Sequence, residues 1–241
     1  MIRLFHVSDV HFGCEDAAAI AWFADLVGRE RPDAVIVTGD LTMRARSREF
    51  AAAGRWLEQL GVPVTVEVGN HDLPYFNLVA RFATPYRRYR ALARMIQRPL
   101  DLPGVSVVPL KTTARFQWRL DWSKGVVSLR ALQKALAIAE AAPRDGLVLV
   151  AAHHPLVEAG TSASAQTRKG REALAALAAA GADAVLTGHV HDPFDIEHVL
   201  GDRTIRLIGA GTLSRRTRDQ PASFNELHVD GRQLSTRARF M

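Results

Sequence analysis

The hydrophobic residues of this chain recur in two patterns. Short apolar runs rich in β-branched residues predict buried strands, and they lie at Arg3–Ser8, Ala34–Thr38, Val64–Val68, Val105–Leu110, Leu147–Ala152, Ala184–Thr187 and Ile205–Ile208. Apolar residues at helical spacing predict helices at Ala17–Glu30, Arg48–Gly61, Leu129–Ala142 and Lys169–Gly181. Because strands and helices alternate, we expect an α/β fold with crossover connections and a largely parallel sheet.

Local signals refine this outline. Ser47 and Ser128 directly precede the second and third predicted helices and are candidate N-caps. Near the end of the chain, Asn225–Val229 and Leu234–Arg239 flank an Asp-Gly pair, which is typical of a hairpin turn. The segment Leu73–Leu100 is the least regular because three prolines interrupt it, and we expect a helical insertion near the site there. The 241 residues fit one domain, 1–241.

Short polar segments follow six of the apolar runs. They are Asp9-Val10-His11, Gly39-Asp40, Gly69-Asn70-His71-Asp72, His153-His154-Pro155, Gly188-His189-Val190-His191 and Gly209-Ala210-Gly211-Thr212. In α/β proteins such strand ends are where sites assemble, so we expect these segments to converge. Carboxylate, amide and imidazole groups gathered from five strands are typical of a two-metal centre that splits phosphate esters.

Each polar segment taken singly has a simpler interpretation. A lone Asp9 is typical of a turn cap, a lone Gly-Asp is typical of a turn, and a lone histidine is usually an interior or surface residue. Asp9 and His11 lie two residues apart, as do His189 and His191, so on extended segments each pair would share a face. The conjunction of all the segments at successive strand ends favours the metal site.

The ordered series resembles the calcineurin-like metallophosphoesterase superfamily, whose pattern Asp-x-His, Gly-Asp, Gly-Asn-His-Asp/Glu, His and Gly-His-x-His it matches over residues 9 to 191. The resemblance implies a four-layer sandwich of two mixed β-sheets flanked by α-helices. Gly-Asp-Leu-Thr and His-His-Pro make the chain most similar to the class III cyclic-nucleotide phosphodiesterase-like group. The implied function is hydrolysis of phosphate diesters by attack of a metal-bridging hydroxide; the alternative is a metal-dependent nuclease or a nucleic-acid-binding domain.

The resemblance also implies roles for single residues. The implied ligands are Asp9, His11, Asp40 and His191 for a first metal, and Asp40, Asn70, His153 and His189 for a second. His71 would be the catalytic acid, and Asp72 would orient or charge it. His153 is preferred to His154 because the ligand histidine of the family stands two residues before the proline. Nitrogen and oxygen ligands without thiolate suit manganese, iron or zinc.

Charge and the remaining composition add expectations about partners. The formal net charge is +6, most basic residues are arginine, and no acidic residue lies between Asp72 and Asp101. An arginine-bearing rim fits a phosphate ester, a nucleotide or a nucleic acid, whereas a solvated basic surface is the alternative. The candidate substrate contacts are Arg44, Arg87, Arg88 and His154.

The single cysteine, Cys14, excludes an internal disulfide and fits a reducing compartment. No apolar stretch approaches the roughly 18–20 residues of a membrane span, and no cleavable leader precedes the first predicted strand. We therefore expect a cytoplasmic protein without a membrane partner. The sequence makes no prediction about oligomeric state.

Overall fold

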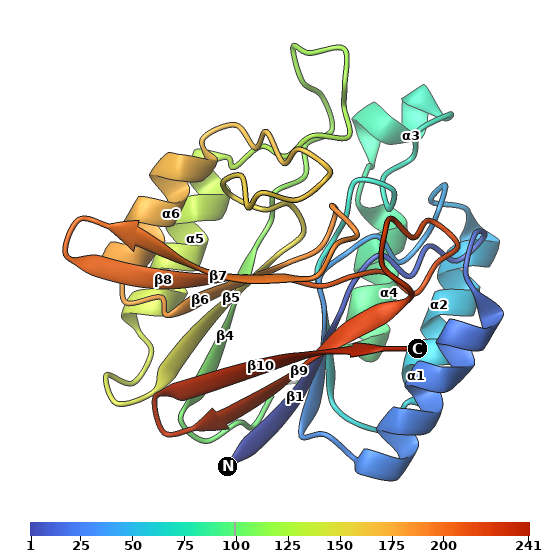
Figure 1. Cartoon of the computed structure of the whole chain (residues 1–241). Helices are drawn as coiled ribbons and strands as arrows, with labels where there is room; N and C mark the ends of the chain where they lie inside the picture. The colour runs from blue at the N-terminus through green and yellow to red at the C-terminus, as the bar shows by residue number, and fades with distance from the viewer. Residues whose placement is uncertain (99) are drawn as a thin grey trace.

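The computed structural model describes residues 1–98 and 100–241 and contains two five-stranded sheets (Figure 1). The first sheet runs in the order β10 (Gln233–Phe240), β9 (Ser223–Asp230), β1 (Ile2–Val7), β2 (Ala34–Val37), β3 (Val64–Val66). The second runs in the order β4 (Val105–Leu110), β5 (Leu147–Ala152), β6 (Ala184–Thr187), β8 (Arg203–Gly209), β7 (Phe194–Leu200). Both sheets are mixed, because β9 and β10 pair antiparallel in one and β7 does so in the other.

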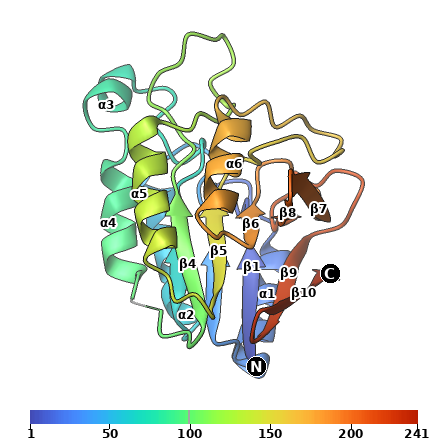
Figure 2. The same cartoon turned by 90° about the vertical axis from the view of Figure 1, so that its left-hand side faces the viewer.

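Helices cover the outer face of each sheet, so the fold has four layers (Figures 1 and 2). Those beside the first sheet are α1 (Ala17–Glu30), α2 (Ser47–Gln59) and α4 (Arg87–Ile96), and those beside the second are α5 (Leu129–Glu140) and α6 (Gly170–Ala179). The short α3 (Leu78–Ala83) lies above α4. The predicted sandwich of two mixed sheets and flanking helices is confirmed.

Three apolar cores hold these layers together. The central core lies between the two sheets and joins residues such as Ile36 of β2 to Leu149 of β5. The outer cores lie between each sheet and its helices, around Phe23 on one side and Leu174 on the other. Because β2 and β5 are buried on both faces, their sequences are almost continuously apolar. This explains why the strand prediction was accurate for the central strands.

Of the two predicted N-caps, Ser128 caps its helix and Ser47 does not. Ser128 caps α5, and its hydroxyl accepts a hydrogen bond from the Ala131 N–H, as predicted. Ser47 is instead the first residue of α2, and Arg46 is the N-cap. The reason is Glu49, whose carboxylate accepts hydrogen bonds from the Arg44 and Arg46 backbone N–H groups and closes the helix start one residue earlier.

Two further regions extend the sequence-based outline. Strand β7 was not predicted, although its exposed and half-buried residues alternate as in an edge strand. Its acidic residues at alternate positions concealed the pattern. The 73–100 segment contains α3 and α4, so its helical character is confirmed, and Pro99 lies outside the described residues. In the described part of the chain no helix is both long and apolar enough to cross a membrane.

Glu67 follows β3 and provides a test of this core. The side chain is 6% exposed, and burial raises the pKa of its carboxyl to about 8. A pKa raised by folding means that the charged form opposes folding, so stability falls as the pH rises from the ordinary pKa of about 4.5 through 8. Glu67→Gln is therefore expected to raise the free energy of unfolding by as much as about 4 kcal/mol at pH 9 and only slightly at pH 5.

Urea unfolding of wild type and variant at both pH values measures this difference. Glu58→Gln, at an exposed position of α2, is the matched control and should change little at either pH. A gain from Glu67→Gln that is equal at pH 5 and pH 9 would contradict the assigned protonation.

Candidate metal centre

The polar segments predicted to form a site do converge. They follow β1, β2, β3, β5 and β6, whose carboxyl ends point to one edge of the sandwich (Figure 1). Backbone hydrogen bonds fasten neighbouring loops, from Asp9 N–H to the Gly39 carbonyl (3.1 Å) and from Gly188 N–H to the His153 carbonyl (2.9 Å). The second of these joins two loops of the second sheet, and the first joins two loops of the first sheet. The His189 N–H donates across to Asp9 Oδ2 (2.8 Å), and this bond joins the loops of the two sheets into a single surface.

One cluster consists of Asp9, His11 and His191. The Asp9 Oδ1 atom lies 3.0 Å from His191 Nε2 and 3.5 Å from His11 Nε2, and the two imidazole nitrogens are 3.3 Å apart. Ligand atoms that surround a cation at roughly 2.0–2.2 Å are separated by about 3.0–3.5 Å. His191 Nδ1 donates to the Arg216 carbonyl (2.7 Å), which leaves its Nε2 lone pair facing the cluster. These three side chains therefore fit a metal ion.

A second cluster consists of Asp40, Asn70 and His153. His153 Nε2 lies 3.3 Å from Asp40 Oδ2 and 3.1 Å from Asn70 Oδ1. The other ring nitrogen, Nδ1, donates to the Thr38 carbonyl (2.8 Å), so Nε2 is the nitrogen that faces the cluster, and it can bind a metal once it has lost its proton. Asp40 Oδ2 is also 3.8 Å from His11 Nε2. Asp40 thus stands between the two clusters, where the resemblance placed the shared ligand.

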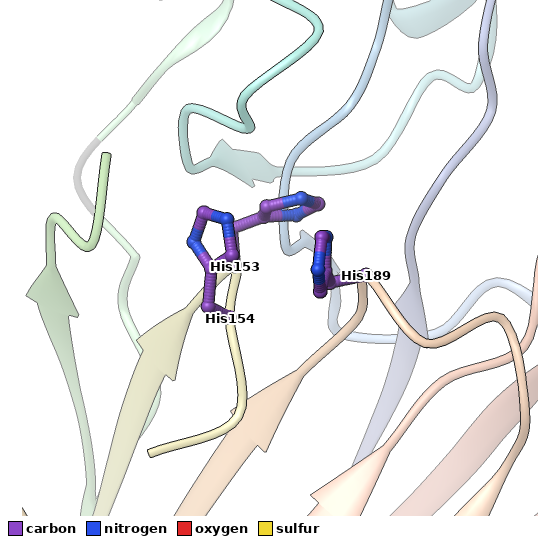
Figure 3. Close-up of side chains that lie close together, drawn as sticks. All are labelled: His153, His154 and His189. Carbon is purple, nitrogen blue, oxygen red and sulfur yellow. The ribbon is translucent and has the colours of Figure 1, made fainter. Parts of the chain in front are cut away.

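His189 lies beside the second cluster. Figure 3 shows its ring close to the rings of His153 and His154, with all three side chains turned toward one another. The ring centroids of His189 and His153 are 5.3 Å apart, and ring nitrogens of the three histidines lie within 4.8 Å of one another. Burial lowers the pKa of His189 to about 3, so its imidazole is neutral and able to bind a metal.

The charges of the site suit cations. Burial raises the pKa of the Asp40 carboxyl, but the positive charges of His153 and His71 outweigh this effect and bring the pKa below its ordinary value. Burial also raises the pKa of Asp9, and the neighbouring His191 again lowers it well below the ordinary value. Both carboxylates are therefore ionised at neutral pH, which is the form that binds a metal.

Backbone strain concentrates on the predicted ligands. Nine non-glycine residues of the described chain have positive φ, and five of them are Asp9 (55°), His11 (50°), Asp40 (51°), His189 (70°) and His191 (63°). The left-handed conformation costs roughly 1–2 kcal/mol per residue. Such strain persists where the surrounding structure enforces it, and it gathers at functional sites.

Two glycines permit the close approach of these loops. A Cβ at Gly69 would collide with the Asp40 carboxylate, and one at Gly188 would collide with Ser8 Oγ and Asp9 Oδ2. The Asp40 carboxylate therefore lies against the loop after β3, and that of Asp9 against the loop after β6. Glycine at both positions is required for the two carboxylates to sit where they do.

The predicted reason for the paired spacing was wrong. Asp9 and His11 do not share the face of an extended segment, because both are in the left-handed conformation after β1 has ended. His189 and His191 diverge: the ring of His189 lies by His153, whereas His191 Nε2 contacts Asp9. The turn, and not strand alternation, delivers one imidazole to each cluster.

His71 lies at the mouth of the first cluster. Its Nδ1 donates to the Met43 carbonyl (2.8 Å), and its ring packs edge-on against the His11 ring with centroids 4.8 Å apart. The remaining nitrogen, Nε2, lies 3.0 Å from an Arg216 guanidinium nitrogen, which is also 3.4 Å from His11 Nε2. Sequence analysis did not single out Arg216 from the other arginines of the loops expected to rim the site. It stands four residues after Thr212, whose hydroxyl donates to the Asp9 carbonyl (2.6 Å).

Asp72 does not orient the His71 ring, contrary to the prediction. The carboxylate is 1% exposed and accepts hydrogen bonds from the backbone N–H groups of Leu41, Thr42 and Gly69 and from the Thr42 hydroxyl. With both oxygens occupied, Asp72 ties the loop after β2 to the loop after β3. It is a positioning residue for Asp40 and not a group that touches substrate.

His154 is also placed differently from the prediction. Its side chain is fully buried, with Nδ1 2.8 Å from the Thr112 hydroxyl and Nε2 2.8 Å from the Ser123 carbonyl. Since protein groups occupy both nitrogens, His154 offers no atom to a substrate. The same geometry favours His153 as the ligand of the pair.

The three candidate arginines occupy different places. Arg44 lines a hollow of about 250 Å3 together with His71 and Asn70, and its guanidinium stacks on the Phe76 ring (5.7 Å). Arg87 faces another cavity, beside α4. Arg88 donates to the Ala45 carbonyl (2.9 Å) and packs against the loop after β2. Neither of the last two lines the hollow beside His71, because α4 turns its N-terminal arginines away from it.

Comparison with known proteins agrees with this arrangement. The profile of the calcineurin-like phosphoesterase family matches residues 2–193. The glycerophosphodiester phosphodiesterase GpdQ of Enterobacter lignolyticus is 36% identical over 80 residues, which cover 29% of this chain and only 29% of that relative.

Solved structures share the whole architecture at low identity. A dimetal phosphatase from Danio rerio is 15% identical with a TM-score of 0.66, over 99% of this chain and 96% of that one. A protein of Thermus thermophilus is 16% identical with a TM-score of 0.61, over 98% and 97%. These likenesses show the fold. The profile match over residues 2–193, which is most of its length, establishes that this chain belongs to the calcineurin-like phosphoesterase family.

Proposed function

We propose that this protein is a binuclear-metal phosphodiesterase. The observation that carries the proposal is the position of Asp40, whose Oδ2 atom faces His153 in one cluster (3.3 Å) and His11 in the other (3.8 Å). Two metal ions held there would supply Lewis-acid chemistry, lowering the pKa of water and neutralising phosphoryl oxygens. The ligands without thiolate suit manganese, iron or zinc.

The surrounding side chains have roles that follow from their positions. His71 is fixed through Nδ1 by the Met43 carbonyl, so when the ring is protonated on both nitrogens Nε2 is the atom that would give a proton to the leaving oxygen. The Arg216 guanidinium lies between His71 and His11, where it would donate to phosphoryl oxygens. His71 from the loop after β3 and Arg216 from the loop after β8 therefore reach the same space beside the first cluster.

The hollow beside His71 supports a diester substrate in particular. We call it the aromatic hollow, and its walls include Tyr75, Phe76 and Trp122 as well as Arg44 and Arg81. A monoester places only charged oxygens beyond its one substituent, whereas a diester must accommodate two substituents. A mostly apolar recess of about 250 Å3 next to the proton donor gives the second substituent room.

The test is a comparison of two synthetic esters. After reconstitution with manganese, kcat/KM should be higher for bis(p-nitrophenyl) phosphate than for p-nitrophenyl phosphate. Both release the same leaving group, so the difference reports recognition of the second substituent. A higher kcat/KM for the monoester would overturn the diesterase assignment. If neither ester were hydrolysed in a metal-dependent way, the proposal that the protein is an enzyme would be wrong.

A further inference from the structure

A strongly basic cavity lies outside the metal centre. We call it the basic groove; its volume is about 650 Å3, and its cationic lining residues are Arg87, Arg90, Arg94, Lys111, Arg115 and Arg130. No acidic residue lines it. Within the described part of the chain, none of these six side chains forms an ion pair. Six unpaired cations around one cavity repel one another, and an occupant with several negative charges would relieve that repulsion.

The fold builds this groove from both halves of the sandwich. Arg87, Arg90 and Arg94 are spaced three and four residues apart and form one stripe along α4. Lys111 follows β4, and Arg130 lies in the first turn of α5. The groove thus crosses the edge of the sandwich between α4 and the start of α5, whose courses can be followed in Figure 2.

Tyr86 forms part of the groove lining. Its hydroxyl donates to the Thr113 carbonyl (3.0 Å), and Lys111 Nζ and the Arg90 guanidinium lie 4.5 Å and 5.7 Å from the ring centroid. The two cations contact the face of the ring, and these cation–π contacts leave their N–H groups available to an anion. Tyr86 therefore holds two of the six cationic side chains, Lys111 and Arg90, in place along the groove.

An exposed aromatic ridge connects the basic groove to the aromatic hollow. It consists of Phe82, Phe116, Trp118 and Trp122, with Phe116 at 5.0 Å and 5.6 Å from the two tryptophans and Phe82 at 6.2 Å from Trp122. Trp118 is 89% exposed. Phe82 and Phe116 adjoin groove residues in the chain, and Trp122 lines the aromatic hollow beside His71.

A hydrogen-bonded seam keeps the ridge in place. Arg81 Nε donates to the Arg115 carbonyl (2.9 Å), and its Nη2 donates to the Ala114 carbonyl (3.1 Å). The Arg81 guanidinium also stacks on the Trp122 ring (5.5 Å). The seam joins α3 to the loop after β4, so the groove, the ridge and the hollow form one continuous track.

We propose that this track binds single-stranded nucleic acid, with phosphates in the basic groove and unstacked bases on the aromatic ridge. A positive groove beside exposed rings is the combination by which proteins bind single strands. The inference rests on the proposed function for its last step, in which a phosphodiester of the bound strand reaches the metal centre. An anionic membrane is the competing occupant, but the cations lie in a recess between two helices that a flat lipid surface does not enter.

The experiment measures binding to the metal-loaded full chain by fluorescence anisotropy. The probe is a fluorescein-labelled 12-nucleotide phosphorothioate oligothymidylate, which resists hydrolysis and keeps its backbone charge. We expect the logarithm of the affinity to fall linearly with the logarithm of salt, by about 0.7 for each phosphate contacted. Arg90→Ala combined with Arg94→Ala should reduce that slope by about 1.4.

A matched control removes the same charge elsewhere. Arg31→Ala combined with Arg237→Ala, at exposed positions at the end of α1 and on β10, should leave the slope as in wild type. Trp118→Ala should weaken binding about tenfold without changing the slope, because it removes stacking and no charge. A duplex of equal length should bind more weakly, since its bases are not free to stack.

Several outcomes would overturn the inference. The first is a salt dependence of binding whose slope both double variants reduce equally. The second is a duplex that binds as tightly as the single strand. The third is binding of anionic vesicles in place of the oligonucleotide. Hydrolysis of bis(p-nitrophenyl) phosphate by the same wild-type preparation separates the two proposals. If the protein hydrolyses the ester but does not bind the strand, only this inference is refuted. If it binds the strand but does not hydrolyse the ester, only the proposed function is refuted.

Discussion

Replacing Asp40 by Asn is expected to weaken both metal sites together and to lower kcat for diesters by more than about 10²-fold. Groups that merely orient metal ligands already cost about 10–100-fold in affinity or activity when they are removed, and Asp40 faces both clusters directly. Asn keeps the shape and can still accept the hydrogen bond that the His71 backbone N–H donates to Oδ1 (2.8 Å). The variant therefore removes charge while the loop keeps its anchor.

Elemental analysis after reconstitution with manganese measures this effect directly. Wild type should hold two ions per chain, and Asp40→Asn should hold clearly fewer than one. Asp202→Asn, on the exposed turn between β7 and β8, is the matched control and should behave as wild type. Retention of two ions by the Asp40 variant would show that the clusters do not depend on a shared carboxylate.

The fold was largely predictable because its central strands are buried on both faces. β2 and β5 are continuous apolar runs, and such runs are hard to mistake. Edge strand β7 was not predicted, because acidic residues at alternate positions interrupt its apolar run. The division into two sheets came from resemblance alone, since local patterns report which segments are strands and not which strands pair.

The chemistry of the site was more predictable than its geometry. Ligand types stood out because polar residues interrupt apolar runs at strand ends, and the structure brings these residues together. The left-handed backbone of Asp9 and His191 left no recognisable mark in the sequence. Arg216 was equally hidden, because nothing in an arginine-rich chain singles out the one guanidinium that lies 3.0 Å from His71 Nε2.

Hydrogen bonding, and not burial, separates the two adjacent histidines, whereas the sequence favoured His153 only through the proline register of the resembled family. His153 and His154 have the same chemistry and neighbouring positions. Only the hydrogen bonds of His154 to Thr112 and Ser123 show that its ring supports the loop. A side chain of metal-binding type is available as a ligand when its lone pair is free, and this depends on contacts made far along the chain.

His71→Ala is expected to keep both metal ions and to lose activity according to the leaving group. The ring lies beside the clusters, but its Nδ1 is committed to the Met43 carbonyl, and its Nε2 faces Arg216 and the space next to the aromatic hollow. A positioned proton donor contributes about 10²–10⁴-fold when the leaving alkoxide is strongly basic. p-Nitrophenolate leaves without a proton, so the loss for bis(p-nitrophenyl) phosphate should be much smaller.

Measuring kcat for that ester and for a dinucleotide, with metal content determined on the same samples, separates proton donation from other roles. Cleavage of the dinucleotide releases a nucleoside alkoxide as the leaving group, so kcat for this substrate should fall by the full factor. His198→Ala, on edge strand β7 away from the polar loops, controls for the removal of an imidazole and should lose neither activity nor metal. Equal losses on both substrates would mean that His71 binds the phosphoryl group, and loss of metal would mean that it is a ligand. Neither result is expected, because His71 Nε2 lies 3.0 Å from the Arg216 guanidinium and faces the space next to the aromatic hollow.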